Sequence, residues 1–311
     1  MDNSTSLPKI VAILGPTASG KTGLAIALAK EFNGEIVNAD SRQVYKRMNI
    51  GTAKPEGVWV KGEYLVEGVP HYLMDIIEPD QEFNLSHFKA EAIKAIETIL
   101  KKGKLPIIVG GTGLYFWSLI DNLDIPHFAP NPELRQELEE KTLEELVVAL
   151  KEKDPETAGT IDLKNPRRVI RALEVVLQSG KSFIELRKKG EALYSVLQVG
   201  LFWDKKELEE RIALRVADQF KSGLKEEVEG LVKAGYSWNL PSMSGIGYHE
   251  FKDYLEGNIS LSDVTALIIK DTMHYAKRQM TWFKRDVRIQ WLNKDDLGRA
   301  RSLVRNFIQI D

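Results

Sequence analysis

The stretch KIVAILGPTASGKT, residues 9–22, decides the fold of this chain. Its first part, Lys9–Leu14, is a short apolar run with β-branched residues, which is typical of a buried strand. Residues 15–22 match the pattern G-x-x-x-x-G-K-[ST], and residues 22–32 have helical composition. The glycines let backbone amides turn toward phosphate oxygens, and the start of the helix adds its positive end. The stretch therefore predicts a phosphate-chain site, but not which phosphate compound binds there.

Every residue of this phosphate-binding loop is a candidate diphosphate ligand. They are Gly15, Pro16, Thr17, Ala18, Ser19, Gly20, Lys21 and Thr22. Lys21 would neutralise phosphate charge, and the Thr22 hydroxyl would ligate Mg²⁺. The sequence thus predicts Mg²⁺ as a cofactor that binds together with the phosphate chain.

Strands and helices alternate after the loop. Strands are predicted at 35–39, 72–77 and 105–109, and helices at 86–102 and 114–120. In the helix at 86–102, Ser86 is the predicted N-cap. One apolar face of that helix is formed by Phe88, Ala92, Ala95, Ile96 and Ile99. Strands that alternate with helices predict a parallel sheet.

The pattern changes where Pro126, Pro130 and Pro132 indicate a linker. From there to about residue 193 the sequence predicts only helices. Thr142 with Glu145 forms a capping box, and a helix that starts at Asn165 and Pro166 ends at Gly180.

Strands and helices return in the last third of the chain. A strand is predicted at 196–203, helices at 205–222, 224–234 and 260–285, and a last strand within RIQWL. We therefore predict an α/β fold with a P-loop NTPase-like parallel sheet core, interrupted by an inserted all-helical domain. The predicted boundaries are 1–125 and 196–311 for the core and 126–195 for the insertion.

Composition limits the function classes. The 311 residues carry a net charge of −2 and no cysteine, which excludes a disulfide framework and a thiolate metal site. No apolar run approaches the ~20 residues of a membrane span, so we expect a soluble cytoplasmic protein. The five histidines show no metal-ligand spacing, so His71, His249 and His274 are interpreted as core or surface residues.

Two basic clusters keep a nucleic-acid partner open despite the balanced charge. The first cluster is Lys164, Arg167, Arg168 and Arg171, and the second is Lys277, Arg278, Lys284, Arg285 and Arg288. A nucleic-acid backbone contact and a solvated helix face are both compatible with the arginines of the first cluster.

Two polar residues follow predicted strands. Asp40 ends the strand at 35–39, where it would hold Mg²⁺ through water, accept a proton from a nucleophile, or cap a following helix. Thr112 lies in the run GGTG after the strand at 105–109, where it would donate to a phosphate or cap the next helix. Many P-loop ATPases carry an acidic residue at that strand end, so the glycines weaken an ATPase interpretation.

Arg211 and Arg215 lie four residues apart and share one helix face. They would clamp phosphates, or form an exposed face paired with Glu207 and Glu210. Spacing alone favours the exposed face.

Six ordered motifs resemble the tRNA dimethylallyltransferase family. They are GPTASGKT at 15–22, NADSRQVYKRMNIGTAKP at 38–55, GGTGLYF at 110–116, NPRRVIRALEV at 165–175, GIGYHE at 245–250 and YAKRQMTWFKRD at 275–286. They span nearly the whole chain and are far more specific together than the loop alone. In GIGYHE, His249 stands where the family commonly has Lys or Arg.

The resemblance implies transfer of a dimethylallyl group from dimethylallyl diphosphate to the exocyclic amine of the adenosine just 3′ of the anticodon. It implies Asp40 as general base, Thr112 at the reacting centre, and Lys21 and Arg215 as catalytic ligands of the diphosphate. The implied contacts to the tRNA anticodon stem-loop are Asp40, Ser41, Arg42, Gln43, Thr112, Arg135, Arg167, Arg168, Arg171, Lys277, Arg278 and Gln279.

Two other functions fit the loop. A small-molecule kinase would use it to bind ATP, with the helical insertion as a lid. A nucleotide switch would bind a protein partner without net chemistry. Nothing in the sequence requires more than a monomer.

Overall fold

The computed structural model describes residues 6–125, 131–186, 188–293 and 296–309. The chain forms two compact units. The core unit comprises Met1–Leu119 and Leu193–Asp311, and the helical unit comprises Ile120–Ala192. The predicted linker residues Pro126 and Pro130 lie outside the described residues.

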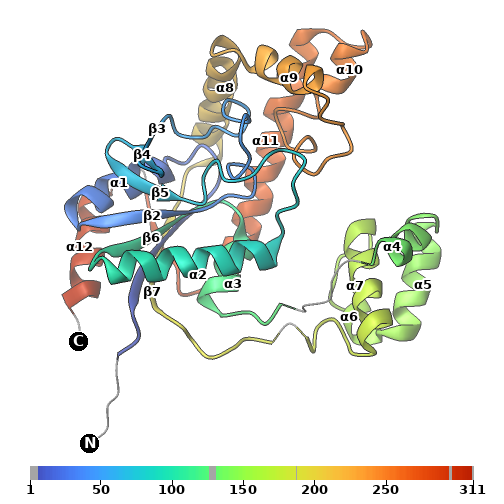
Figure 1. Cartoon of the computed structure of the whole chain (residues 1–311), viewed down its shortest axis with the longest axis horizontal. Coiled ribbons are helices and arrows are strands. Elements are labelled where there is room, and N and C mark those ends of the chain that lie inside the picture. Colours follow the sequence, from blue (N-terminus) through green and yellow to red (C-terminus); the bar gives the residue numbers. More distant parts are fainter. Residues whose placement is uncertain (1–5, 126–130, 187, 294–295, 310–311) are drawn as a thin grey trace, which may run out of the picture. The chain divides into compact units, whose positions relative to one another are not determined.

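A sheet forms the centre of the core unit (Figure 1), with eight strands among the described residues in the order β3-β4-β5-β2-β6-β1-β7-β8. From β5 to β8 neighbouring strands are parallel, whereas β3 and β4 are antiparallel additions at one edge. The strands are β1 Lys9–Leu14, β2 Gly34–Ala39, β3 Val58–Val60, β4 Glu63–Val66, β5 Val69–Tyr72, β6 Leu105–Gly110, β7 Ser195–Leu201 and β8 Gln290–Leu292. This confirms the predicted α/β fold with a parallel sheet core.

The central strands are buried almost throughout because helices cover both faces of the sheet. On one face, α1 (Lys21–Glu31) and α12 (Leu297–Gln309) pack into the main apolar core. On the other, α2 (Leu85–Lys101) lies along β2 and β6 (Figure 1). Its predicted apolar face is buried as expected. The predicted cap is wrong, since Asn84 caps α2 in a reciprocal capping box with His87.

The antiparallel edge was not predicted, and the strand expected at 72–77 is wrong. Leu73 and Asp75 both have φ of 59°, which a strand does not allow, so β5 ends at Tyr72. The hairpins turn at residues 61–62 and 67–68, where Lys61 and Glu67 precede glycines and all four residues have positive φ. Such two-residue turns match the twist of antiparallel strands.

The helical unit contains α4 (Pro132–Glu139), α5 (Leu143–Lys153), α6 (Pro155–Ala158) and α7 (Pro166–Ser179). These helices enclose their own apolar core. The predicted Thr142–Glu145 capping box is confirmed, as are the Asn165 cap and the end of α7 at Gly180. The expectation of helix up to residue 193 is wrong, because the chain beyond Gly180 forms turns and a bridge between Leu123 and Lys189.

Beyond the sheet, the core unit forms a further group of helices (Figure 1), namely α8 (Lys205–Lys221), α9 (Leu224–Lys233), α10 (Phe251–Leu255) and α11 (Leu261–Phe283). The helix α3 (Gly113–Ile120) lies instead beside α2, where the Tyr115 ring stacks on Phe88. A second apolar core joins α8, α9 and α11 to the loop that follows β2. The short α10 and the terminal α12 were not predicted from the sequence.

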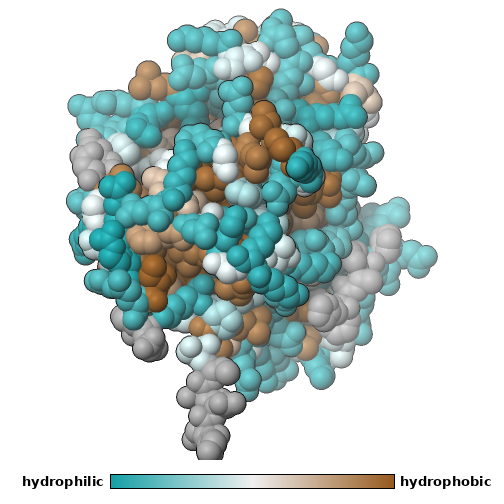
Figure 2. Space-filling model, turned by 60° about the vertical axis from the view of Figure 1, so that its left-hand side comes forward, coloured by the Kyte–Doolittle hydropathy of each residue, from teal (hydrophilic) through white to brown (hydrophobic). Residues whose placement is uncertain are grey.

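The surface in Figure 2 is mainly hydrophilic, with hydrophobic side chains in small groups between polar ones. Among the described residues, no helix combines the length and the apolar character needed to cross a membrane.

Candidate active site

Three neighbouring strands end at one edge of the sheet and deliver the candidate residues. In the sheet, β6 lies between β1 and β2, with Gly110 opposite both Leu14 and Ala39. The phosphate-binding loop follows β1, Asp40 follows β2, and Thr112 comes shortly after β6. The carboxyl ends of parallel strands are where α/β proteins bind ligands. The structure therefore brings together the candidates that strand position predicted.

Side chains from outside the loop hold its backbone in place. Trp203 Nε1 donates to Ser19 O at 2.9 Å, and Arg211 Nε donates to Ala18 O at 2.8 Å. The Arg211 guanidinium also stacks on the Trp203 ring, 4.2 Å from its centroid.

Arg215 also faces the loop. Its Nη1 donates to Thr17 Oγ1 at 3.1 Å. The exposed-face interpretation that spacing favoured is therefore wrong for Arg215, whereas Arg211 is exposed as expected although its guanidinium also contacts the loop.

Lys21 begins α1, and its ammonium folds back so that Nζ donates to Pro16 O at 2.6 Å. Burial and, to a smaller extent, the positive charge of Arg215 lower the pKa of Lys21 to about 7, while Asp40 opposes both. Burial also lowers the pKa of Arg215, with Arg211 acting in the same direction. Two desolvated cations beside the loop would be stabilised by an anion.

Gln279 of α11 bridges two of the strand-end loops. Its Oε1 accepts from the Thr17 amide at 2.8 Å, and its Nε2 donates to Gly111 O at 2.9 Å. A Cβ at Gly111 would lie 2.1 Å from Gln279 Nε2, and a Cβ at Gly113 would lie 2.1 Å from the Trp282 ring. The glycines of GGTG therefore allow α11 to approach the strand ends closely.

The Asp40 carboxylate closes a turn. Its Oδ1 accepts from the amides of Arg42 at 2.8 Å and Gln43 at 3.4 Å. The chain continues as turns rather than as a helix, so the proposed helix N-cap is wrong. Within the described residues, Asp40 Oδ2 accepts no hydrogen bond, which leaves that oxygen open to a ligand.

Thr112 lies beside Ser41 and Tyr275. Its hydroxyl accepts from the Ser41 amide at 3.2 Å and donates to Ser41 Oγ at 3.4 Å, instead of capping α3. Burial and the negative charge of Asp40 raise the pKa of the Tyr275 hydroxyl. A hydrogen bond with Thr112 acts in the opposite direction but has a smaller effect. Tyr275 is therefore a neutral hydroxyl between Thr112 and Asp40, and no motif in the sequence had assigned it a role.

Two cavities meet at Asp40. The first, of about 260 Å³, follows the loop, and its charged lining residues are Lys21, Arg215 and Asp40. The second, of about 290 Å³, is rimmed by Arg42 and Arg278. Both cavities share six lining residues, namely Thr17, Asp40, Thr52, Ala53, Arg215 and Tyr275. A phosphate-binding space thus opens directly onto a second space with a basic rim.

Glu227 of α9 holds the wall of these cavities. Its carboxylate accepts from the amides of Asn49, Ile50 and Gly51 at 2.8–3.0 Å, and from Tyr248 Oη at 2.7 Å. These contacts of Glu227 were not predicted, since no sequence motif links residue 227 to the loop after β2.

Gln43 and Arg42 hold the same wall. Gln43 Nε2 donates to the carbonyls of Thr52 and Ala53, at 3.2 and 3.1 Å. The Arg42 guanidinium donates to Pro241 O and Ser244 Oγ. On α11, Lys277 and Arg278 are exposed, and Arg278 lies 5.8 Å from the Tyr275 ring centroid.

The described arginines of the helical unit fall into two groups. Arg135 makes a bidentate pair with the buried Glu174, at 2.7 and 2.8 Å, and Arg171 contacts the same carboxylate at 3.3 Å. Arg167 and Arg168 are exposed at the start of α7, and within the described part of the chain no carboxylate pairs with either. The second group is therefore available to an anionic partner.

Comparisons with known proteins agree on one family. Residues 43–286 match the IPP transferase family. A tRNA dimethylallyltransferase of Acetivibrio thermocellus is 44% identical over 96% of both chains, and one of Thermoanaerobacter sp. is 45% identical over 97% of this chain and 96% of its own.

Solved structures give the same result. The tRNA isopentenylpyrophosphate transferase of Bacillus halodurans has a TM-score of 0.72 at 34% identity, with 97% of each chain covered. A eukaryotic dimethylallyltransferase acting on tRNA has a TM-score of 0.79 at 28% identity, over 97% of this chain and 79% of its own.

Proposed function

This chain belongs to the IPP transferase family and is an enzyme that transfers a prenyl group to tRNA. On that premise we propose its two substrates and the atoms that react. The donor is dimethylallyl diphosphate. The acceptor is the exocyclic amine of the adenosine 3′-adjacent to the anticodon. The enzyme works as a monomer in the cytoplasm.

The observation that carries this proposal is the meeting of the two cavities at Asp40. The diphosphate would lie on the loop in the first cavity, with its allylic carbon directed toward Asp40. The adenine would enter through the second cavity, past Arg42 and Arg278. A base within an anticodon loop must leave its stack to reach such a site, so this adenosine would be flipped out.

Breaking the allylic carbon–oxygen bond sends its electron pair to the diphosphate oxygen and leaves positive charge on carbon. Lys21, Arg215 and the loop amides would stabilise the negative charge as it develops. These cations are already desolvated and held in place, so little reorganisation is needed when the charge appears.

The Mg²⁺ cofactor fits this cavity. The Thr22 hydroxyl lines it at the start of α1, and oxygen ligands are those that Mg²⁺ prefers. Ser19 Oγ is buried without a hydrogen-bond partner among the described residues, so a bound phosphate or hydrated ion would supply one. Thr22 and the diphosphate would hold Mg²⁺, which supplies charge neutralisation to the leaving group.

On the acceptor side, the adenine amine forms the new carbon–nitrogen bond and must lose a proton. Asp40 Oδ2 would accept that proton, while Oδ1 remains fixed by the amides of Arg42 and Gln43. Thr112 and Tyr275 would position the adenine through their hydroxyl groups.

Diphosphate binding should take up protons at Lys21. Because the pKa of Lys21 is about 7 in the free protein, much of this group is neutral at pH 8, and an anion would restore its charge. We expect affinity to fall as pH rises from 7 to 9, by up to about tenfold per pH unit. Calorimetry in buffers of different ionisation enthalpy measures the uptake, and Lys21→Met should abolish it. Equal uptake in Lys21→Met would contradict the assignment.

The arginines at the start of α7 should contribute to tRNA affinity. Replacing Arg167 and Arg168 with Gln should weaken tRNA binding and leave diphosphate binding unchanged. The logarithm of the tRNA association constant is plotted against the logarithm of the salt concentration. The slope of this plot should flatten by about 0.7–0.9 for each phosphate group that the variant no longer neutralises. Arg171 is left intact because it also pairs with the buried Glu174.

A control for that experiment is the double replacement of Lys151 and Lys153 with Gln on α5, which removes two exposed cations from the same unit. It should leave the salt slope unchanged. Equal slopes for wild type and the Arg167/Arg168 variant would show that these arginines form a solvated face.

The function itself is tested by following labels. The protein is incubated with unmodified tRNA and either dimethylallyl diphosphate labelled in its prenyl group or ATP labelled in its terminal phosphoryl group. Prenyl label should move to tRNA, and phosphoryl label should not move. Phosphoryl transfer to a small acceptor would favour the kinase, and binding without transfer of either label would favour the switch.

A further inference from the structure

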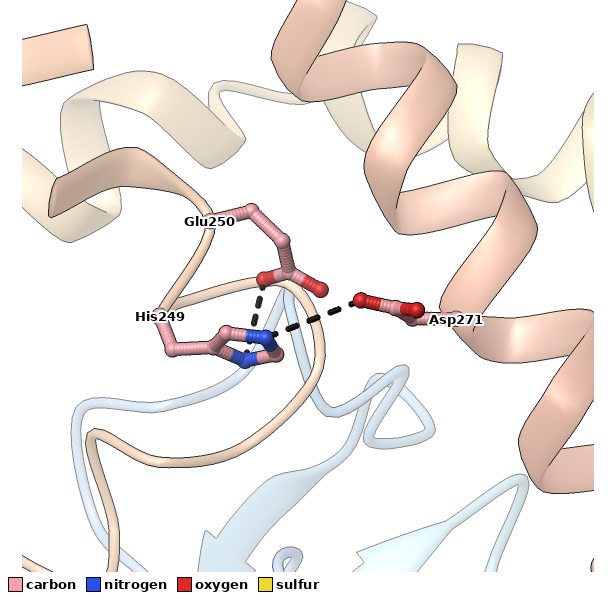
Figure 3. A group of neighbouring side chains, drawn as sticks. All are labelled: His249, Glu250 and Asp271. Atoms are coloured by element: carbon pink, nitrogen blue, oxygen red, sulfur yellow. Dashed lines mark ion pairs between the residues drawn. The ribbon is translucent and has the colours of Figure 1, made fainter. Parts of the chain in front are cut away.

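One side-chain cluster of the core unit has no part in the proposed reaction. His249, Glu250 and Asp271 each place a ligand atom within 4.8 Å of the others (Figure 3). His249 and Glu250 lie just before α10, and Asp271 lies on α11. Across residues 6–125, 131–186, 188–293 and 296–309, no other three His, Cys, Asp or Glu side chains gather in this way.

The Glu250 carboxylate is buried and only half satisfied. Its side chain is 2% exposed, and its Oε2 accepts from the Gly247 amide at 2.9 Å. Its Oε1 has no hydrogen-bond partner among the described residues. Figure 3 shows this second oxygen directed toward Asp271. A buried carboxylate oxygen without a partner is costly, so it points to a ligand that the cluster would bind.

The His249 ring presents a lone pair to the same space. Its Nδ1 lies 3.0 Å from Gly245 O, and a carbonyl oxygen only accepts, so Nδ1 carries the hydrogen. In the neutral ring Nε2 is then an acceptor, and it lies 3.7 Å from Asp271 Oδ2. Two acceptors facing each other need a proton or a metal ion between them. A backbone carbonyl that fixes the histidine tautomer is the usual partner of a metal-ligating imidazole.

We propose that His249 Nε2, Glu250 Oε1 and an Asp271 oxygen bind a divalent transition-metal ion of the Zn²⁺ type, with water in the remaining position. An imidazole with two carboxylates suits Zn²⁺ better than Mg²⁺ or Ca²⁺, which prefer oxygen ligands alone. The two carboxylates balance the charge of the ion. His274, whose Nδ1 lies 3.9 Å from Asp271 Oδ1, stands next to the site on α11.

The ion would stabilise one wall of the second cavity. Ser244 and Gly245 line that cavity together with Asp40 and Arg42. The bound ion would tie their segment to α11, which also carries Tyr275 and Gln279. Its role is therefore structural, and it is separate from the Mg²⁺ at the phosphate-binding loop.

The test uses the full chain after treatment with a chelator. Calorimetric titration with ZnCl₂ should show one saturable site, and Co²⁺ should give the visible absorption of a low-coordinate ion. His249→Gln and Asp271→Asn should each weaken Zn²⁺ binding by at least about 10–100-fold, the loss that removing an outer-shell partner of a metal ligand already causes. Asp253→Asn, which removes an exposed carboxylate on α10, is the matched control and should bind like wild type. Hydrogen exchange of the amides at 244–250 should slow when Zn²⁺ binds.

A second variant separates loss of the ligand from loss of the fold. His249→Lys places a fixed ammonium beside the two carboxylates, so it should melt near the wild-type temperature and gain nothing from Zn²⁺. The absence of saturable Zn²⁺ binding to wild type, or equal affinity in wild type and His249→Gln, would overturn the proposal. An imidazolium at His249 in neutral solution, seen by NMR with Zn²⁺ present, would also overturn it, since a proton would then fill the gap.

Discussion

Replacing Asp40 with Asn should lower the rate constant of prenyl transfer by roughly 10²–10⁴. An adenine amine is a poor nucleophile, and its proton becomes acidic only as the new carbon–nitrogen bond forms. The site therefore needs an ionised acceptor aimed at that amine. Asn keeps the size of the side chain and an oxygen that accepts from Arg42 and Gln43, so the turn should persist. Only the charge and the proton acceptor are lost.

Single-turnover kinetics measure this effect, with tRNA affinity and melting temperature recorded alongside. Affinity for tRNA should change little, because backbone phosphates dominate it. The matched control is Asp204→Asn, which alters a carboxylate that caps α8 outside both cavities. A wild-type transfer rate in Asp40→Asn would leave Asp40 as a turn residue and remove the base from the mechanism.

Replacing Lys21 with Ala should reduce kcat/KM by at least about 10²–10³ and weaken diphosphate binding. The ammonium is the cation at the start of α1, and a charge-assisted hydrogen bond contributes ~1.5–3 kcal/mol even to a ground state. More charge develops on the diphosphate in the transition state, so kcat should fall as well as affinity. Steady-state kinetics at saturating tRNA separate the two effects.

Lys30→Ala provides the comparison for Lys21. Lys30 lies in the last turn of the same helix and pairs only at the surface with Glu67. Its loss should leave kcat/KM within about twofold of wild type, because exposed ion pairs contribute little. Near wild-type kcat/KM in Lys21→Ala would mean that the loop does not hold the leaving group.

The central part of the fold could be predicted because local signals and global packing agree there. β1 is a continuous apolar run because helices cover both faces of the sheet, and the loop motif fixes the turn into α1. α7 was located by Asn165 and Gly180, whose caps depend on adjacent residues alone. The hairpins of β3, β4 and β5 were missed although Lys61–Gly62 and Glu67–Gly68 are turn dipeptides, because their strands are very short.

The site could be predicted in part. Strand ends indicated where Asp40, Thr112 and the loop would meet, since parallel strands end at one edge. Side-chain direction was not predictable in the same way. Helix spacing placed Arg211 and Arg215 on a shared face, but only the packing of α8 shows that this face meets the loop. Glu227, Tyr275 and the His249 cluster depend on contacts between distant segments, which no local pattern encodes.

Identifying the modified nucleoside tests the proposed function most directly. A tRNA with adenosine 3′-adjacent to the anticodon, and a second that differs only by guanosine there, are incubated with the protein, dimethylallyl diphosphate and Mg²⁺. Both are digested and analysed by mass spectrometry. We predict adenosine prenylated on its exocyclic amine in the first tRNA, at that position alone, and no prenylated nucleoside in the second. Prenylation at another position, or none in either tRNA, would contradict the proposed function.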